Sequence, residues 1–397
     1  MTNRLIALLA ALGMIGSLGI DTYLPAFPML AEHFQVAPLL LQQSLSGYLL
    51  GMAVMMLFYG ALSDGFGRRP VILWSLAVFA LGSFGAASST SIDALLAWRT
   101  VQGLAAGAGS VVGRAIIQDR SQGADALKAM SQVIMTFALA PAIAPVLGGW
   151  LLQLSGWRSI FVFLGVFSSL LWLGCWMGLA ESLPPAQRQR IAFGPLLRRY
   201  VDVMSDPRFL LLTIAGGLGF SVFSLYIGAA APFVIDTLKR GSDGFGWLFA
   251  PLMGGMISGS WTGARLAKHL EGATLITAGY ALLILATAAA TLYFSFAEAR
   301  LPWAVLPLGA STFGLALINP GLALAAIGRF PGSRGLASSL NGFINTLFFA
   351  LFAGVVAPLI AHDARLLAGV TLVSALLSAL CWRISPSTAH CPFRGNV

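Results

Sequence analysis

Two ionisable residues interrupt stretches of sequence that are otherwise apolar. Asp21 lies in the string DTYLPAFP, and Arg99 lies in WRTVQGLAAGAG. An ionisable side chain at membrane depth is costly and usually faces a partner or a water-filled cavity. A carboxyl group there can take up and release a proton as its surroundings change. Two alternatives stay open: Asp21 in headgroup water, and Arg99 extending to the outer headgroups.

A second charged motif, GALSDGFGRRP at residues 60–70, separates two long apolar runs. Its aspartate and two arginines would each cost several kcal/mol in hydrocarbon, so this stretch is expected in water. Basic residues beside an apolar run predict the cytoplasmic side of a membrane. The residues of interest are Gly60, Asp64, Gly67, Arg68 and Arg69. An ordinary solvated loop is the alternative.

The composition predicts that the chain is an integral membrane protein. Of 397 residues 58% are apolar and 9% are charged, and the mean hydropathy is +0.85. A soluble domain is about half apolar and about a quarter charged. Apolar runs of about 20 residues favour membrane-spanning helices over barrel strands. The net charge of +9 is assigned to basic loops at a lipid surface, and nucleic acid is not an expected partner.

The apolar runs predict an all-α fold with twelve membrane-spanning helices in two six-helix halves. The expected halves are 1–179 and 209–383, joined by a cytoplasmic linker at 180–208 and followed by a short tail at 384–397. GARLAKHLEG in the second half weakly echoes GALSDGFGRRP in the first, as an internal repeat would. The expected spans are 5–28, 41–62, 71–87, 94–117, 133–154, 160–179, 209–235, 245–267, 273–296, 302–327, 336–361 and 366–382.

The distribution of basic residues predicts that both termini are cytoplasmic. In this arrangement 17 of the 23 Lys and Arg residues face the cytoplasm, and Arg99 lies within the membrane. The bias towards the inside is the usual one for membrane proteins. With these spans, Asp21 and Arg99 each lie about 10 Å below the outer surface. The five basic residues expected outside are Arg158, Lys239, Arg240, Arg300 and Arg365.

The chemistry present favours a secondary transporter over an enzyme. The sequence contains no HExxH, no GxSxG and no Walker motif. No cofactor or metal is expected, because the three cysteines lack ligand spacing. An ion gradient is the expected energy source, and one carboxylate suffices for a proton, whereas sodium needs several converging oxygens.

The motifs resemble those of the major facilitator superfamily, and the resemblance covers the whole chain. GALSDGFGRRP resembles its signature between helices 2 and 3, and Arg99, Gln102 and Gly103 resemble the helix 4 signature of proton-coupled members. DTYLPAFP and GWRSIF resemble the bicyclomycin and chloramphenicol resistance (Bcr/CflA) branch of drug:H+ antiporters. The string PAIAPVLGGW resembles the helix 5 signature of antiporters; its kink-forming and small residues are Pro141, Pro145, Gly148 and Gly149.

The resemblance implies roles for individual residues. Asp21 would carry the proton, and Arg99 would tune its affinity. Asp64, Gly67 and Arg68, with Asp119 as partner, would form a latch that closes the cytoplasmic side. Helices 1, 4, 7 and 10 would line the cavity, which makes Tyr23, Gln102, Tyr226 and Asn319 candidate substrate contacts. Hydrogen bonds between packed helices are the other explanation for these polar residues.

The expected function is proton-coupled export of small, largely apolar drugs or antibiotics across the bacterial inner membrane, by a monomer. Residues 13–19 contain no second acid, so exchange should depend on Asp21, and divalent cationic drugs are not the expected cargo. Export of a metabolite such as a nucleoside or sugar stays open, as does a scaffold or sensor that transports nothing. Cavity shape decides the cargo, and motifs do not reveal it.

Overall fold

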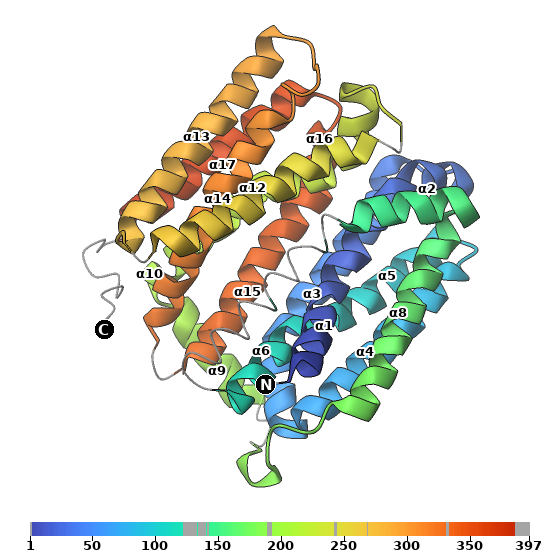
Figure 1. The fold of residues 1–397 in the computed structure, drawn as a ribbon, viewed down its shortest axis with the longest axis vertical. Helices are drawn as coiled ribbons and strands as arrows, with labels where there is room; N and C mark the ends of the chain where they lie inside the picture. Colours follow the sequence, from blue (N-terminus) through green and yellow to red (C-terminus); the bar gives the residue numbers. More distant parts are fainter. Residues whose placement is uncertain are drawn as a thin grey trace. The chain divides into compact units, whose positions relative to one another are not determined.

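The structure is a computed structural model that describes residues 2–121, 133, 140, 143–188, 193–241, 244–267, 269–330 and 333–385. In these ranges every regular element is helical. The chain forms two compact units, Met1–Pro195 and Leu196–Val397. Figure 1 shows the spans of the first unit in blue to green and those of the second in yellow to red. Pro141 and residues 122–132 fall outside the described residues.

The first unit contains the expected spans 1 to 6. α1 and α2 are joined by the short 3-10 helix η1, and α5 and α6 together form the fourth span. The bounds are α1 Asn3–Asp21, η1 Leu24–Ala26, α2 Phe27–Phe34, α3 Pro38–Phe66, α4 Arg68–Ala87, α5 Ile92–Ala106, α6 Ala108–Arg120, the helix Ile143–Ser155, α8 Trp157–Gly178 and η2 Pro185–Gln187.

The second unit begins with an extra helix, α9, before its spans. Two of its spans contain π-helical turns, η3 and η6. The bounds are α9 Phe193–Met204, α10 Pro207–Gly228, α11 Ala230–Pro232, η3 Phe233–Thr237, α12 Phe245–Leu266, α13 Gly272–Phe296, α14 Leu306–Gly328, α15 Arg334–Leu351, η6 Phe352–Val356, α16 Ala357–Ile360 and α17 Ala364–Ile384.

Nine helical segments in the described ranges are long and apolar enough to cross a membrane. The other three expected spans have identifiable differences. The fourth is divided at Gly107, and the fifth is only partly described, with an apolar helix at Ile143–Ser155. The eighth, α12, has 22 residues, but its glycines, serines and tryptophans lower its mean hydropathy.

Helix pairing follows the same pattern in both units. The second span packs on the fourth in each (α3 on α5, α12 on α14), and the third on the sixth (α4 on α8, α13 on α17). In both units the third and fourth spans also touch. This repetition is typical of transporters built from two similar halves.

Glycines let several of these helix pairs meet backbone to backbone. A Cβ on Gly103 of α5 would fall on the Tyr48 carbonyl of α3, and one on Gly109 of α6 would fall on the Leu12 carbonyl of α1. In the second unit, Gly255 of α12 lies against the Gly309 carbonyl of α14 in the same way. Small residues at helix contacts replace the hydrophobic effect as the source of close packing in lipid.

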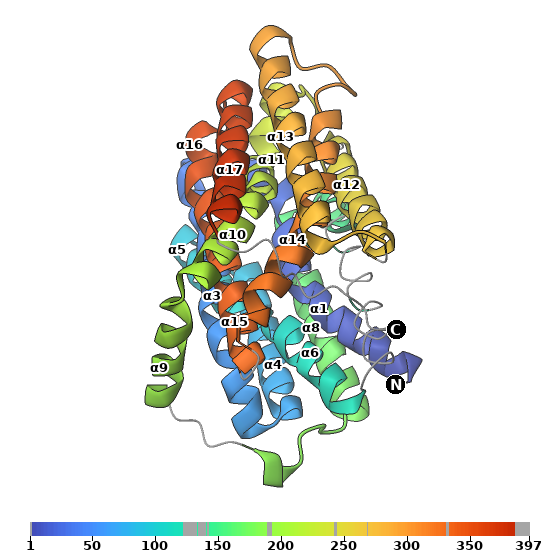
Figure 2. The ribbon, with the colours of Figure 1, turned by 90° about the vertical axis from the view of Figure 1, so that its left-hand side faces the viewer.

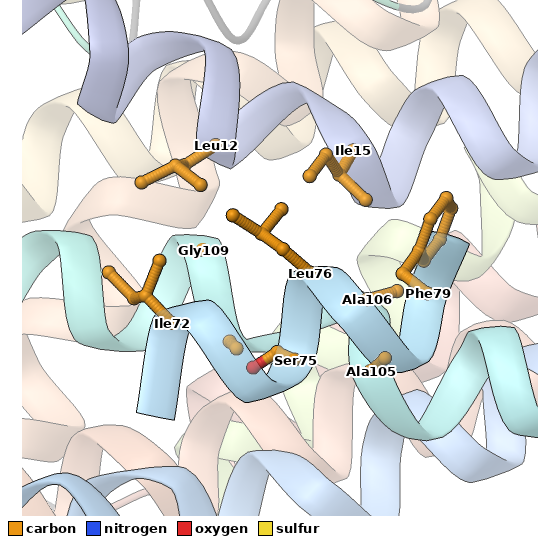
Figure 3. A pocket seen from close by; sticks show the side chains of 10 residues that line it. Leu12, Ile15, Ile72, Ser75, Leu76, Phe79, Ala105, Ala106 and Gly109 are labelled. Carbon is orange, nitrogen blue, oxygen red and sulfur yellow. The ribbon is translucent and has the colours of Figure 1, made fainter. Parts of the chain in front are cut away.

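The break in the fourth span is closely packed. Figure 3 shows Leu12 and Ile15 of α1 facing Leu76 of α4, with Ala105 and Ala106 nearby. These residues enclose a void of about 10 Å³. A void of that size would hold about one water molecule, and its apolar lining disfavours even that. The void between α1, α4 and the fourth span is therefore too small to hold cargo.

Two helix ends differ from the expectations. The first span was expected to end at residue 28; α1 ends at Asp21, but η1 and α2 carry the apolar helical segment on to Phe34. The second was expected to end at residue 62, but α3 runs to Phe66. The expected loop at 60–70 is thus mostly helical, and only Gly67 separates α3 from α4. Its φ of 104° is a conformation that favours glycine.

Candidate functional site

Arg99 lies fully buried inside the first unit, and aromatic rings surround it. Its guanidinium carbon is 4.5 Å from the centre of the Tyr23 ring and 4.3 Å from the centre of the Tyr48 ring. Phe161 of α8 lies 5.9 Å away. The faces of aromatic rings attract cations, so these rings offset part of the cost of burying the charge. The α5 helix that holds Arg99 is capped by Ser91, whose side chain accepts a hydrogen bond from Ala94 N.

The guanidinium of Arg99 uses one of its nitrogens within the described residues. Nη1 donates to Gln102 Oε1 at 2.8 Å, whereas Nε and Nη2 are buried without a hydrogen-bond partner. Gln102 donates in turn to Ser83 Oγ at 2.7 Å. An unpartnered buried charged donor is costly, so it is seldom kept without a purpose. Two donors of Arg99 thus stay available to a ligand or to a carboxylate in another state.

Asp21 is the last residue of α1 and is only 4% exposed. No ion pair within 4.0 Å joins it to Arg99 among the described side chains, and no hydrogen bond to its carboxylate is present there. Of the two expectations for such residues, a partner or a water-filled cavity, a direct ion pair between Asp21 and Arg99 is not formed among the described residues. Tyr48 lies within electrostatic reach of both residues.

Tyr48 connects the α1 helix to Arg99. Its ring lies beneath the guanidinium, and its hydroxyl donates to the Gly16 carbonyl at 3.0 Å. Gly19 leaves room for that hydroxyl, because a Cβ there would collide with it. Tyr23, two residues after Asp21, has its hydroxyl 2.8 Å from Ser44 Oγ of α3. Sequence reasoning missed Tyr48, since an aromatic residue in an apolar run carries no distinctive signal.

The antiporter motif of the fifth span packs beside Asp21. A Cβ on Gly148 would fall on the Thr22 carbonyl, so the helix Ile143–Ser155 touches the chain directly after Asp21. Pro145 and Gly149 lie on the same helix, whereas Pro141 is outside the described residues. The close contact leaves no space for a larger residue at position 148.

The charged residues of the 60–70 motif meet around the Arg68 side chain. Its Nη1 lies 2.5 Å from Asp64 Oδ1, and its Nε lies 3.1 Å from Asp119 Oδ2 at the end of α6. Nη1 also donates to Ser63 Oγ. Arg69 points elsewhere and donates from Nη2 to the Trp176 carbonyl of α8, while Gly60 is a helical residue of α3. The structure thus brings together three of the expected latch residues within the first unit.

Glu181 completes this cluster, and the sequence analysis assigned it no role. Its carboxylate accepts hydrogen bonds from the backbone amides of Arg68 at 3.0 Å and Arg69 at 3.2 Å, which open α4. It also accepts from Ser182 N and Leu183 N. Helix N-termini favour negative charge because their first amides lack helical partners. The carboxylate lies where a Gly67 side chain would be, so that glycine is required for the contact.

The candidate substrate contacts of the second unit lie on two helices. Tyr226 on α10 is buried, and its ring centre is 5.4 Å from that of Phe233. Asn319 on α14 is half-buried, and its Oδ1 has no hydrogen-bond partner among the described residues. Tyr226 is thus packed against an aromatic ring of its own span. Asn319 retains a free acceptor.

Comparison with known proteins places the chain among transporters. The family model described as Major Facilitator Superfamily matches residues 9–353. An uncharacterised MFS-type transporter of Bacillus subtilis, YdgK, is 33% identical over 70% of this chain and 71% of its own. Multidrug transporter MdfA of Yersinia pestis is 27% identical over 91% and 88%, and a bicyclomycin resistance protein homolog of Haemophilus influenzae is 26% identical over 88% of each chain.

A solved structure supports the fold. The human organic anion transporter MFSD10 (TETRAN) aligns with a TM-score of 0.71, at 21% identity, over 95% of this chain and all of its own. This likeness confirms the predicted all-α membrane fold. The relatives confirm the resemblance to the Bcr/CflA branch that the motifs indicated.

Proposed function

We propose that this chain, which belongs to the Major Facilitator Superfamily, exports small, largely apolar drugs in exchange for protons. Relatives that share most of its length are named multidrug transporters and a bicyclomycin resistance protein homolog. The observation that carries the proposal is a buried acid and a buried base in one unit with no ion pair between them. Such residues at membrane depth are a functional site by default.

The proton step is assigned to Asp21. On the outer side, Asp21 takes up a proton and cargo leaves; on the inner side, cargo binding and the proton on Asp21 exclude each other. The burial of Asp21 supports this role, because a neutral carboxyl is tolerated in an apolar site far better than a carboxylate. No resident cofactor enters the cycle.

Arg99 is assigned the response to the charge on Asp21. When Asp21 loses its proton, the carboxylate needs a partner, and two nitrogens of Arg99 have no hydrogen-bond partner among the described residues. Tyr48 contacts both the guanidinium and the α1 backbone, so a movement of α1 towards Arg99 would be felt there. Tyr23 and Gln102 hold the guanidinium from two other directions.

The Arg68 cluster is assigned the role of a latch at the cytoplasmic face. This assignment rests on the orientation with both termini inside, in which the α3–α4 junction and the end of α6 face the cytoplasm. The ion pairs of Arg68 with Asp64 and Asp119 support it, because they fix the shape of that face of the first unit. The protein is proposed to work as a monomer in the inner membrane.

Proton movement in everted membrane vesicles tests the proposal. Respiration acidifies the vesicle lumen, and chloramphenicol, bicyclomycin and nucleosides are then added one at a time. We expect alkalinisation on addition of a drug and no response in Asp21→Asn vesicles. Asp93→Asn is the matched control, since this acid is exposed at the start of α5 and should leave the response intact.

The other outcomes are equally informative. A response to nucleosides alone would replace drug export by metabolite export. Transport of drug by Asp21→Asn that still follows the proton gradient would overturn the assignment of the proton to Asp21. No response to any compound, with the protein present in the membrane, would contradict drug:proton exchange.

A further inference from the structure

Two polar side chains of the second unit have buried oxygens that lack a hydrogen-bond partner. Thr213 of α10 is 1% exposed, and its Oγ1 has no partner among the described residues. The Oδ1 of Asn319 on α14 is buried without a partner in the same part of the chain. An unsatisfied polar group costs several kcal/mol in hydrocarbon. Such groups are therefore expected where a ligand supplies the missing bonds.

Asn345 of α15 adds a third polar side chain. Its Nδ2 donates to the Asn341 carbonyl one turn earlier at 2.8 Å, so its Oδ1 is the atom that remains to accept a hydrogen bond. This oxygen lies against Gly216 of α10, where an added Cβ would stand 3.3 Å from it. A larger residue at position 216 would crowd the amide, so the glycine keeps the oxygen open.

The two asparagines lie at nearly the same depth of the second unit. Figure 2 shows α10, α14 and α15 side by side, and the three helices contact one another. The ion pair of Asp206 with Arg329, at 2.6 Å, joins the start of α10 to the end of α14. Gly216 and Asn319 are each about 15 Å along their helices from this pair. Gly216 also contacts Asn345, so both amides lie at the level of this glycine.

Thr213 lies on the face of α10 that contacts α15. At about 100° per residue it lies between Gly216 and Gly217 around the helix, and these glycines contact Asn345 and Phe348 of α15. A helical threonine usually donates to the carbonyl three or four residues earlier, but among the described residues the Thr213 hydroxyl makes no such bond. This hydroxyl is therefore available as a donor and as an acceptor.

The spans that hold these residues carry no charge. The stretches 209–228 of α10, 306–328 of α14 and 335–351 of α15 contain no Asp, Glu, Lys, Arg or His. A charged cargo group would find no counter-ion on these helices, and an unpaired charge is costly at membrane depth. The group that this cluster can bind is therefore neutral.

The chemistry of the cluster matches a hydroxyl group. The amide oxygens of Asn319 and Asn345 accept hydrogen bonds, and the Thr213 hydroxyl both donates and accepts. A cargo hydroxyl likewise does both, so it complements each of the three. Helix packing alone does not explain the cluster, because the bonds between helices that would satisfy Thr213 and Asn319 are not present among the described residues.

We propose that Thr213, Asn319 and Asn345 form a binding site for a neutral cargo that carries hydroxyl groups. The amide oxygens accept from cargo O–H groups, and the Thr213 hydroxyl bonds a cargo oxygen. This inference rests on the proposed export function and names its cargo class: neutral, largely apolar drugs with at least one hydroxyl. Cations and compounds without a donor are disfavoured at this site.

Equilibrium binding of radiolabelled chloramphenicol, a neutral drug whose hydroxyls can donate, to the purified full chain tests the site. The comparison ligand is its dimethyl ether, whose ether oxygens accept hydrogen bonds but donate none. We expect the ether to bind the unaltered protein about tenfold more weakly. Asn319→Leu and Asn345→Leu should each weaken chloramphenicol binding about tenfold and narrow the difference between the ligands.

Two threonine substitutions form a matched pair. Thr213→Val removes the hydroxyl of the site and should weaken chloramphenicol binding severalfold. Thr291→Val on α13 removes a hydroxyl that donates within its own helix, to the Thr287 carbonyl at 2.8 Å, and should leave both affinities unchanged. Retained binding of the ether shows that the Asn319→Leu and Asn345→Leu proteins are folded, so a loss confined to chloramphenicol is a loss of hydrogen bonding.

Several results would contradict the inference. Equal affinity of the unaltered protein for chloramphenicol and its ether would show that no donor is recognised. Normal chloramphenicol binding by both asparagine variants, or an equal loss of both ligands, would exclude the amide oxygens as the acceptors. Absence of chloramphenicol binding by the unaltered protein would also overturn the site.

The binding measurement uses no proton gradient, so it is separate from drug:proton exchange. Vesicles that respond to chloramphenicol while both asparagine variants bind it normally would leave the exchange standing and remove the site. Binding that depends on Asn319 and Asn345, together with vesicles that give no response, would leave the site standing and remove the exchange.

Discussion

The guanidinium carbon of Arg99 lies 4.3 Å from the centre of the Tyr48 ring, and Tyr48 donates a hydrogen bond to the Gly16 carbonyl of α1. Arg99 of α5 is thus connected to α1, the helix that ends at Asp21, through the Tyr48 ring and not through an ion pair with a carboxylate. Salt bridges inside apolar surroundings gain little net stability, because desolvation offsets the attraction. A guanidinium held by rings and one amide remains free to accept a carboxylate later in a transport cycle.

Replacement of Arg99 by lysine should impair transport although the charge is kept. Lysine is a point charge without the planar fork that stacks on Tyr48 and bonds Gln102. The lost stacking and hydrogen bond predict a drop of at least about tenfold in drug-dependent alkalinisation, equivalent to about 1.4 kcal/mol. Arg300→Lys, at an exposed position of the second unit, is the control and should transport normally. A fully active Arg99→Lys would show that the charge alone suffices.

Gly103→Ala should destabilise the first unit, because the added Cβ meets the Tyr48 carbonyl. Overpacking at a close helix contact costs about 1–3 kcal/mol. The control is Gly113→Ala, which lies in the same span on α6. The added Cβ has only Leu9 Cδ2 within 4 Å, at 3.9 Å, so this substitution should be neutral or slightly stabilising. Thermal unfolding of both variants in detergent makes the comparison. Equal melting temperatures would show that α3 and α5 can separate at no cost.

Glu181→Gln should weaken the junction between α3 and α4. The carboxylate accepts four backbone hydrogen bonds. In glutamine one oxygen is replaced by an NH₂ group, which cannot accept hydrogen bonds from these backbone N–H groups. We expect a loss of about 1–3 kcal/mol in the free energy of unfolding. Glu298→Gln, at an exposed acid of the second unit, is the control. Unchanged stability of Glu181→Gln would mean that water serves these amides equally well.

Stability of the second unit should depend on pH through Asp206. Burial opposes ionisation, but hydrogen bonds from Arg329 and from the amides of Phe209 and Arg208 outweigh it and hold the pKa of the Asp206 carboxyl below its usual range. A carboxyl with a lowered folded-state pKa contributes fully above its unfolded pKa of about 3.9, and the contribution is lost as the pH falls through the folded pKa.

Unfolding measured between pH 6 and pH 3 tests this dependence. Asp206→Ala should cost about 1–2 kcal/mol at pH 6, mostly through the lost helix cap, since exposed ion pairs contribute little. The difference between this variant and the unaltered protein should shrink towards pH 3. Arg329→Gln removes the ion pair but keeps the cap, so it should cost less. A difference that is constant across this pH range would exclude Asp206 as its source.

Much of the fold could be predicted from the sequence because lipid imposes strong rules. Long apolar runs fixed the class, and the two-half organisation reappears in the repeated helix pairs. The helix ends were less predictable. The apolar residues that follow Asp21 hide the end of α1, and the charges of the 60–70 motif suggested a loop where α3 continues to Phe66.

The candidate site was predicted in its ionisable members and missed in the residues that hold them. Asp21 and Arg99 stand out because charge is rare in these runs. Tyr48 and Glu181 do not stand out, since one is an aromatic residue among apolar neighbours and the other is an acid in a polar linker. Their roles depend on which backbone groups come within reach after folding, and no local pattern records this.

The glycine contacts that bring helix backbones together affect how rigid each half is. Gly103, Gly109 and Gly148 join four different spans of the first unit without an intervening layer of side chains, and Gly255 does the same for α12 and α14. Packed helices can shift relative to each other mostly because the side chains between them change rotamer. At these glycine contacts no such side chains lie between the helices. Each half should therefore be stiff, and the compliance that alternating access needs should reside outside these helix pairs.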